Sequence, residues 1–117
     1  RCAMQILYVG IDSAYNQFMS ILIDPSGNET QVLFDLCPDW AGKTVLEIGS
    51  GDGRLTWRYA ERAARVVALE PEEKTHLLAL KNRPREMGHV ELRKIGFEAF
   101  TRQNKERFNL ALLSWSL

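Results

Sequence analysis

Three glycines at alternate positions, Gly49, Gly51 and Gly53, stand out as residues that could bring a backbone close to a ligand. They lie in "LEIGSGDG" and directly follow "TVLEI", an apolar run of strand length. A bare backbone can turn sharply, and a helix that begins near Gly53 would offer unpaired N–H groups and a partial positive end. The loop therefore predicts a site for a polar or anionic group. Turn glycines without any ligand are the alternative interpretation.

A carboxylate at the end of the next apolar run points to a nucleoside ligand. Glu70 ends "RVVALE", 21 positions after Gly49 (70 − 49), and its two oxygens suit the two hydroxyls of a ribose. A dinucleotide fingerprint, G-x-G-x-x-G, would need a third glycine at position 54, which is Arg54. No Gly-Lys-Ser/Thr follows, so a phosphate-binding P-loop is excluded as well. The loop predicts a cofactor without a pyrophosphate.

The elements that must position these residues alternate between strand and helix. "RLTWRYAERAA" predicts a helix with Leu55, Tyr59 and Ala63 on one face, and "PEEKTHLLALKN" predicts a helix whose buried face carries Leu77 and Leu80. "RVVALE", "HVELRKI" and "FNLALLSWSL" have the pattern of strands, and "FEAFTRQ" that of a short helix or turn. This order predicts an α/β fold with a parallel sheet, flanking helices and a ligand at the carboxyl ends of the strands.

The N-terminal third is harder to interpret. "MQILYVG" is compatible with a strand and "SAYNQFMSILI" with an amphipathic helix, and periodicity does not separate these readings. "DPSGN" predicts a turn, and "ETQVLFDL" a short helix. We therefore expect a single domain, in which residues 1–40 form a helical or irregular lead-in and residues 41–117 form the cofactor-binding half.

Composition excludes several classes of protein. The 117 residues are 45% apolar and 26% charged, as in globular domains, and 15 Lys plus Arg balance 15 Asp plus Glu. Neutral charge disfavours a nucleic-acid or membrane-surface partner, and the apolar runs are shorter than the ~20 residues of a membrane span. We expect no signal peptide, expect Cys2 and Cys37 to be reduced thiols, and see no His or Cys spacing for a metal. The expected location is cytoplasmic.

The motifs together resemble those of class I S-adenosylmethionine-dependent methyltransferases. "VLEIGSGDGRLT" is similar to the first motif of that family, and "VVALEP" to the second, with Glu70 in the acidic place. "FNLALLSWSL" resembles the fourth-strand motif of small-molecule methyltransferases of type 11 and related groups. The resemblance covers about residues 24 to 117. It implies a Rossmann-like methyltransferase fold of which only the first four core strands are present.

The resemblance also implies the cofactor, S-adenosyl-L-methionine, and residues that would bind it. Glu47 would hold the methionine part together with the backbone of residues 49–51, and Glu70 would bind the ribose. Phe97 or Glu98 would neighbour the adenine, although the family's Gly-Asp is absent from "IGFEAF". Ser114 and Trp115 would line the methyl-transfer site. The full predicted cofactor-binding set is Glu47, Gly49, Ser50, Gly51, Gly53, Glu70, Phe97, Glu98, Ser114 and Trp115, with no catalytic residue and no metal ligand assigned.

Several alternatives remain open at this point. The expected acceptor is a small molecule, since RNA adenine dimethylases carry Asn-Pro-Pro-aromatic where this chain has "SWSL". An NAD-dependent oxidoreductase is disfavoured by the glycine spacing, and a cofactor-binding or interaction module without catalysis is a third possibility. The last apolar strand is expected at a sheet edge. We therefore expect either a piece of a longer methyltransferase or a homodimer that pairs through that edge.

Overall fold

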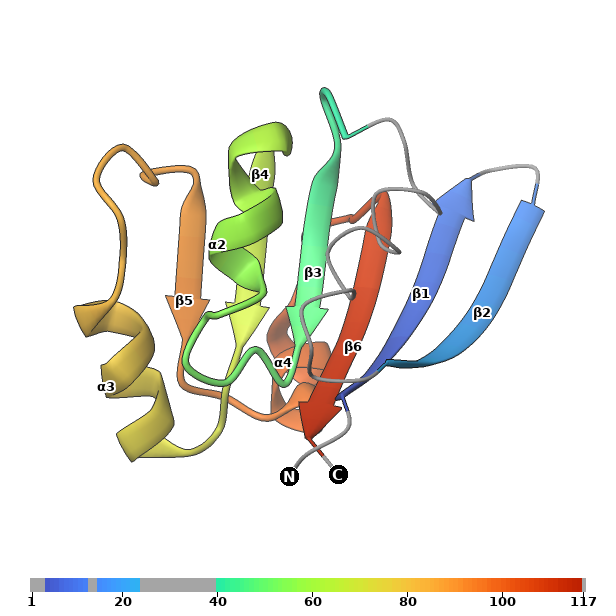
Figure 1. The fold of residues 1–117 in the computed structure, drawn as a ribbon. Coiled ribbons are helices and arrows are strands. Elements are labelled where there is room, and N and C mark those ends of the chain that lie inside the picture. The colour runs from blue at the N-terminus through green and yellow to red at the C-terminus, as the bar shows by residue number, and fades with distance from the viewer. Residues whose placement is uncertain (1–3, 13–14, 24–39, 117) are drawn as a thin grey trace.

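The computed structural model of the chain describes residues 4–12, 15–23 and 40–116, and the side chains of residues 40–113. Within these residues, six strands form one sheet in the order β2-β1-β6-β3-β4-β5 (Figure 1). Four of them run parallel: β3 (Thr44–Ile48), β4 (Arg65–Leu69), β5 (Val90–Arg93) and β6 (Leu110–Ser116). The predicted α/β class and the predicted parallel sheet with flanking helices are confirmed.

Helices cover both faces of this sheet. The helix α2 (Thr56–Tyr59), continued by the 3₁₀ turn η1 (Ala60–Arg62), lies on the same face as α3 (Glu73–Lys81), whereas α4 (Phe97–Gln103) lies on the opposite face (Figure 1). The chain runs from β3 outward to β4 and β5, and then returns to place β6 on the other side of β3. This reversal between β3 and β6 is a topological switch point, where open α/β sheets bind ligands at the carboxyl ends of their strands.

The N-terminal segment forms a hairpin. The strands β1 (Met4–Asp12) and β2 (Tyr15–Ile23) pair antiparallel, and β1 pairs antiparallel with β6. The expected helical or irregular lead-in is therefore wrong for these residues, and the amphipathic-helix reading of "SAYNQFMSILI" is wrong with it. The reason is non-local, because β6 offers an edge of backbone groups to which β1 can pair. The short helix expected over "ETQVLFDL" falls in residues 24–39, outside the described residues.

The last apolar strand is an inner strand and does not lie at a sheet edge. β6 is bonded on one side to β3 and on the other to β1. The expectation of an exposed edge at β6 is wrong, because the N-terminal hairpin supplies the neighbour that was missing from the sequence argument. The two outer strands of the described sheet are β2 and β5. The exposed edge was the reason to expect a homodimer through β6, and β6 has no such edge.

The apolar core lies on both faces of the parallel strands. Along β4, Val66 and Ala68 pack into the cluster beneath α2, and Val67 and Leu69 pack into the cluster that contains Phe100 of α4. Successive side chains of a strand point to opposite faces, so a strand buried on both faces reads as a continuous apolar run. This explains why "RVVAL" was recognisable as an inner strand.

The two predicted helix faces have different outcomes. Leu55, Tyr59 and Ala63 are all buried, as the spacing of "RLTWRYAERAA" predicted. In α3 the prediction is wrong, because Leu77 and Leu80 are 55% and 42% exposed. The buried residue of this helix is Ala79. α3 lies beside the outer strand β5 (Figure 1), and it turns its small residue toward the sheet.

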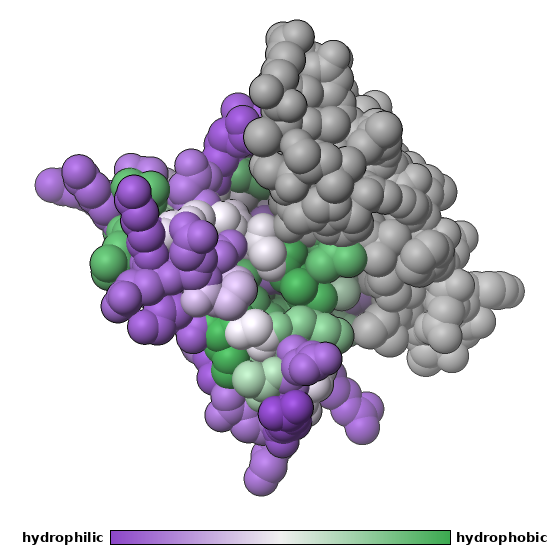
Figure 2. Space-filling view, turned by 90° about the horizontal axis from the view of Figure 1, so that it is seen from below, coloured by the Kyte–Doolittle hydropathy of each residue, from purple (hydrophilic) through white to green (hydrophobic). Residues whose placement is uncertain are grey.

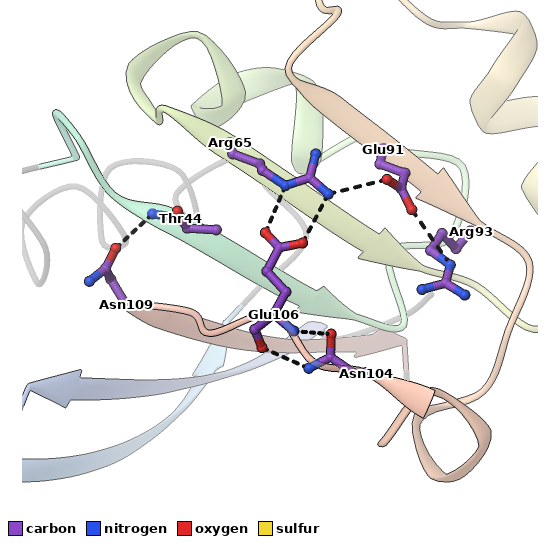
Figure 3. Close-up of polar contacts among 7 residues, drawn as sticks. All are labelled: Thr44, Arg65, Glu91, Arg93, Asn104, Glu106 and Asn109. Carbon is purple, nitrogen blue, oxygen red and sulfur yellow. Dashed lines mark hydrogen bonds and ion pairs between the residues drawn. The ribbon is translucent and has the colours of Figure 1, made fainter. Parts of the chain in front are cut away.

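A network of charged side chains ties the segment that leads into β6 to the sheet (Figure 3). The Arg65 guanidinium donates from Nε and Nη2 to the two carboxylate oxygens of Glu106, over 2.7 and 3.0 Å, and Nη2 also donates to Glu91 over 3.2 Å. Hydrogen bonds to Glu106 raise the pKa of Arg65 above its ordinary value, so the Arg65 guanidinium stays charged. Asn109 completes the attachment by exchanging hydrogen bonds with the Thr44 backbone.

We expect the Arg65–Glu106 pair to contribute modestly to stability. The Arg65 and Glu106 side chains are 39% and 34% exposed, so solvent screens the interaction and its coupling energy should be about 1 kcal/mol or less. A double-mutant cycle of Arg65→Met and Glu106→Gln, followed by urea unfolding at low and high salt, measures this energy. A coupling of several kcal/mol that does not change with salt would contradict the expectation.

Candidate functional site

The glycine loop connects β3 to α2 at the switch point. The backbone N–H groups of Gly49 and Ser50 both donate to the carbonyl oxygen of Leu69, over 2.9 and 3.0 Å, and the Ser50 hydroxyl, which is buried, donates to the same oxygen over 3.3 Å. Gly53 N–H donates to the Ser50 carbonyl over 3.1 Å, which closes the turn. The loop is therefore held against the carboxyl end of β4, and Glu70 directly follows that end.

The backbone of this loop requires glycine. Gly49, Gly51 and Gly53 have φ values of 75°, 62° and 84°, which L side chains rarely adopt. At Gly53 space is also lacking, because a Cβ atom would lie 2.6 Å from Nε1 of Trp57. The indole ring thus packs against the bare backbone of Gly53. The sequence prediction of a bare, sharply turning loop at these positions is confirmed.

Gly53→Ala should destabilise the fold by about 2 kcal/mol or more, since it combines left-handed backbone strain with a steric clash. Gly42→Ala is the matched control for strain alone, because Gly42 has φ 74° and nothing within 4 Å of a Cβ, and it should cost about 1 kcal/mol. Gly88→Ala has neither feature and should be nearly neutral. Urea unfolding of the three variants tests this ranking. Equal losses for Gly42→Ala and Gly53→Ala would show that Trp57 moves aside freely.

Glu70 joins the end of β4 to the tip of the glycine loop. Its Oε1 accepts the Gly51 N–H over 2.9 Å, and its Oε2 accepts the Glu72 N–H over 3.0 Å. The Glu70 backbone N–H donates to the Arg93 carbonyl, so the ends of β4 and β5 are held side by side. A carboxylate offers about four lone-pair sites, so Glu70 keeps acceptor capacity for further hydroxyl donors. The structure therefore brings two of the predicted site residues, Gly51 and Glu70, into direct contact.

Glu47, the next-to-last residue of β3, is fully buried beneath α2. Its Oε1 accepts hydrogen bonds from the Thr56 hydroxyl over 2.7 Å and from the Tyr59 hydroxyl over 2.6 Å. Its Oε2 is also buried and has no hydrogen-bond partner among the described residues. Burial raises the pKa of Glu47 from its ordinary value of 4.5 to about 7, partly opposed by the two hydroxyl groups.

The sequence prediction named Glu47 and missed its two donors. Thr56 and Tyr59 are three positions apart, so they lie on one face of α2, and both are fully buried there. A glutamate inside an apolar strand is the signal that could have located them, because a buried carboxyl group requires nearby donors. Two hydroxyl residues at helical spacing directly after the loop are the candidates for that role.

The remaining predicted site residues lie beyond the glycine loop. Phe97 is 47% exposed at the start of α4, which follows the carboxyl end of β5. The Glu98 side chain is 92% exposed, and its Oε2 lies 4.0 Å from Nη2 of Arg102. Ser114 and Trp115 are in β6, where their backbones pair with those of β1, but their side chains are outside the described part of the chain.

The end of the sheet that carries the glycine loop is apolar at its centre. Figure 2 looks onto the carboxyl ends of the parallel strands and shows hydrophobic residues gathered there, with hydrophilic residues around them on the side that is not grey. Among the described residues, no cluster of His, Cys, Asp or Glu could hold a metal ion. In the same part of the chain, every helix is too short or too polar to cross a membrane. The site thus combines polar loop groups with neighbouring apolar surface.

Comparison with known proteins identifies the type of fold. The chain superposes on a conserved hypothetical protein from Streptococcus pyogenes with a TM-score of 0.60 and 22% identity, covering 68% of this chain and 52% of that one. It superposes with a TM-score of 0.51 on an RNA methyltransferase from Salinibacter ruber solved with S-adenosyl-L-homocysteine, at 27% identity and over 63% and 50% of the two chains. A putative S-adenosylmethionine-dependent methyltransferase from Listeria monocytogenes gives a TM-score of 0.51 at 23% identity, over 62% and 34%.

Sequence comparison gives a shorter match. No protein-family model matches the chain. Phosphoethanolamine N-methyltransferase 1 from Triticum aestivum is 43% identical over 47 residues, which are 40% of this chain and 9% of the wheat protein. The chain therefore spans about half the length of the two solved structures from S. pyogenes and S. ruber, and a small part of this curated relative.

The sheet order, the glycine loop and Glu70 at the switch point define a class I methyltransferase fold. The solved structures that share this architecture include S-adenosylmethionine-dependent methyltransferases, and the resemblance seen in the sequence motifs is confirmed at the level of the fold. The sheet differs from the expectation, because the antiparallel hairpin β1-β2 extends the four parallel strands on the β6 side.

Proposed function

We propose that this chain is the cofactor-binding part of an S-adenosylmethionine-dependent methyltransferase that acts on a small-molecule acceptor. The observation that carries the proposal is the contact between Glu70 and the Gly51 N–H at the switch point of the sheet. This contact holds the carboxylate that we propose for the ribose directly against a loop that is suited to the rest of a nucleoside cofactor. The solved structures that bind or are named for this cofactor share the fold and support the proposal.

The residues present fit this cofactor. Its methionine part has a cationic amino group, and Glu47 offers a buried carboxyl oxygen without a partner in the described structure. The backbone of residues 49–51 turns sharply two residues after Glu47, and Glu70 has acceptor capacity left for the ribose hydroxyls. Phe97 offers an exposed side chain at the start of α4, and we propose that the adenine lies beside it. Ser114 and Trp115 are proposed to line the methyl-transfer site from β6.

The bound cofactor supplies an electrophilic methyl group on a sulfonium, whose displacement leaves a neutral thioether. The protein then contributes mainly by holding the reactants in line and keeping water out. The apolar centre of the surface in Figure 2 suits that role. No residue is assigned as a general base.

The choice of a small acceptor rests on two observations. The wheat relative is named for phosphoethanolamine, a small amine, and this chain has equal numbers of acidic and basic residues. Against it, the Salinibacter ruber neighbour is an RNA methyltransferase. An RNA-binding surface would require a basic field, which a neutral chain does not supply overall. Transfer of labelled methyl groups to small amines, and none to RNA, would support the proposed acceptor class.

Calorimetric titration of S-adenosyl-L-homocysteine into the chain tests the proposed cofactor. We expect saturable binding by the wild type and at least a tenfold weaker affinity for Glu70→Ala, which loses charged hydrogen bonds of about 1.5–3 kcal/mol each. Glu61→Ala, an exposed glutamate on η1, is the matched control and should bind like the wild type. Tight binding of NADH in its place would favour a dinucleotide oxidoreductase. A folded chain that binds neither ligand would contradict the proposal.

A further inference from the structure

We propose that a proton and a cationic group of the ligand compete for one atom, Oε2 of Glu47, so that cofactor binding releases a proton from this buried carboxyl group. The inference rests on the proposed function and adds to it a pH dependence of the same site. Thr56 and Tyr59 act in it as positioning residues, because both donate to Oε1 and leave Oε2 without a donor.

The two carboxyl oxygens of Glu47 have different surroundings. Oε1 accepts two short hydrogen bonds, from the hydroxyls of Thr56 and Tyr59. Both hydroxyls donate to the same oxygen, so the proton of the neutral carboxyl group belongs on Oε2. Oε2 is buried and has no partner among the described residues. The oxygen that is left without a donor is therefore also the oxygen that carries the proton.

Residues of β4, β6 and α2 surround Glu47. Its backbone neighbours in the sheet are Ala68 of β4 and Leu112 of β6, both apolar, and α2 contributes the hydroxyls of Thr56 and Tyr59. Burial and then the charge of Glu47 raise the pKa of Tyr59 well above its ordinary value, so Tyr59 stays neutral and donates. No charged side chain of residues 40–113 contributes to the pKa of Glu47. A cationic partner for this carboxylate must come from a ligand or from outside those residues.

The chemistry of the ligand decides which protonation state of Glu47 it can bind. An ammonium group donates its own hydrogens and accepts none, so it can bind Oε2 only when the carboxyl group is ionised. On binding, the O–H bond of Glu47 breaks and its proton passes to the buffer, while the ligand ammonium keeps its protons. No covalent bond to the ligand forms. Since burial raises the pKa of Glu47 to about 7, this exchange occurs near neutral pH.

Titration of S-adenosyl-L-homocysteine in pairs of buffers with different ionisation enthalpies measures the released proton. With half-protonation near pH 7, release should be about 0.9 proton per ligand at pH 6, about 0.5 at pH 7 and about 0.1 at pH 8. The same equilibrium predicts an affinity about tenfold tighter at pH 8 than at pH 6. Glu47→Gln is the control, because the amide at position 47 cannot release a proton. Position 47 should then contribute neither proton release nor a pH dependence of the affinity. Comparison of the two proteins cancels the titration of the ligand itself.

Tyr59→Phe provides a second, independent variant. It removes one hydroxyl that lowers the pKa of Glu47 and keeps the aromatic ring, so the profiles of affinity and proton release should move to higher pH. A purely structural role of Tyr59 would lower the affinity without moving the profile. If Glu47→Gln does not fold, this shift alone decides the outcome.

Two failures are distinguishable. Binding of S-adenosyl-L-homocysteine with the same proton release in the wild type and in Glu47→Gln, or an unmoved profile in Tyr59→Phe, would overturn the inference and leave the proposed function standing. Absence of binding at every pH by a folded chain would overturn the proposed function itself.

Discussion

The free energy of unfolding of this chain should fall by about 2–3 kcal/mol as the pH rises from 5 to 8, because the buried carboxyl group of Glu47 must then ionise. Its pKa is 4.5 in an ordinary environment and about 7 in the fold. Between these values the folded chain binds more protons than the unfolded chain. The stability that this group contributes is therefore fully present below pH 4.5 and is lost as the pH rises through 7.

Urea unfolding at pH 5, 6, 7 and 8 measures this loss, and Glu47→Gln is the variant that isolates it. The amide does not titrate, so the difference in the free energy of unfolding between wild type and variant should change by about 2–3 kcal/mol from pH 5 to pH 8. The contributions of all other titrating groups cancel in this difference. Parallel pH profiles for the two proteins would show that Glu47 keeps its ordinary pKa in the fold. That result would also remove the basis for proton release on ligand binding.

Tyr59→Ala should destabilise the chain by about 3–5 kcal/mol, as expected for the removal of a fully buried aromatic side chain. The ring of Tyr59 is 0% exposed, and it stacks on Trp40 with 5.1 Å between the ring centroids. Its hydroxyl also satisfies the buried Glu47. The variant thus combines a cavity with the loss of a hydrogen bond to a buried acceptor.

Tyr59→Phe separates these two contributions. It keeps the ring and removes the hydroxyl, so it should cost about 1–2 kcal/mol, the usual cost of leaving a buried polar group with one partner fewer. Thermal or urea unfolding of both variants at pH 6 provides the comparison. A Tyr59→Phe variant as unstable as Tyr59→Ala would mean that the hydrogen bond dominates and that ring packing contributes little.

The parts of the fold that the sequence predicted are those decided locally. "TVLEI" and "RVVAL" are inner strands whose central residues are buried on both faces, and their nearly continuous apolar runs make this visible in the sequence. The N-terminal hairpin was mispredicted because its strand state depends on pairing with β6, more than 90 residues away at Met4↔Ser116. Local periodicity carries no information about such a partner.

The same distinction applies to helix α3 and to the site. Leucine spacing in α3 marks an apolar stripe, but the position of α3 beside the outer strand leaves Leu77 exposed and buries Ala79. At the site, the glycines and Glu70 were found because their spacing and strand-end positions are sequence features. The hydroxyl donors of Glu47 were not found, because their role follows from the way α2 packs on β3.

The pairing of β1 with β6 has a mechanical consequence. Met4 is opposite Ser116, and the register continues to Gly10 opposite Leu110, so the start of β1 and the end of β6 lie side by side at one end of the sheet (Figure 1). The hydrogen bonds of an antiparallel pair lie perpendicular to the strands. A force that pulls Met4 and Ser116 apart therefore loads these bonds one after another, beginning at this pair, and separates β1 from β6 progressively. Stretched in this way, the hairpin should detach at low force while the four parallel strands and the glycine loop remain folded.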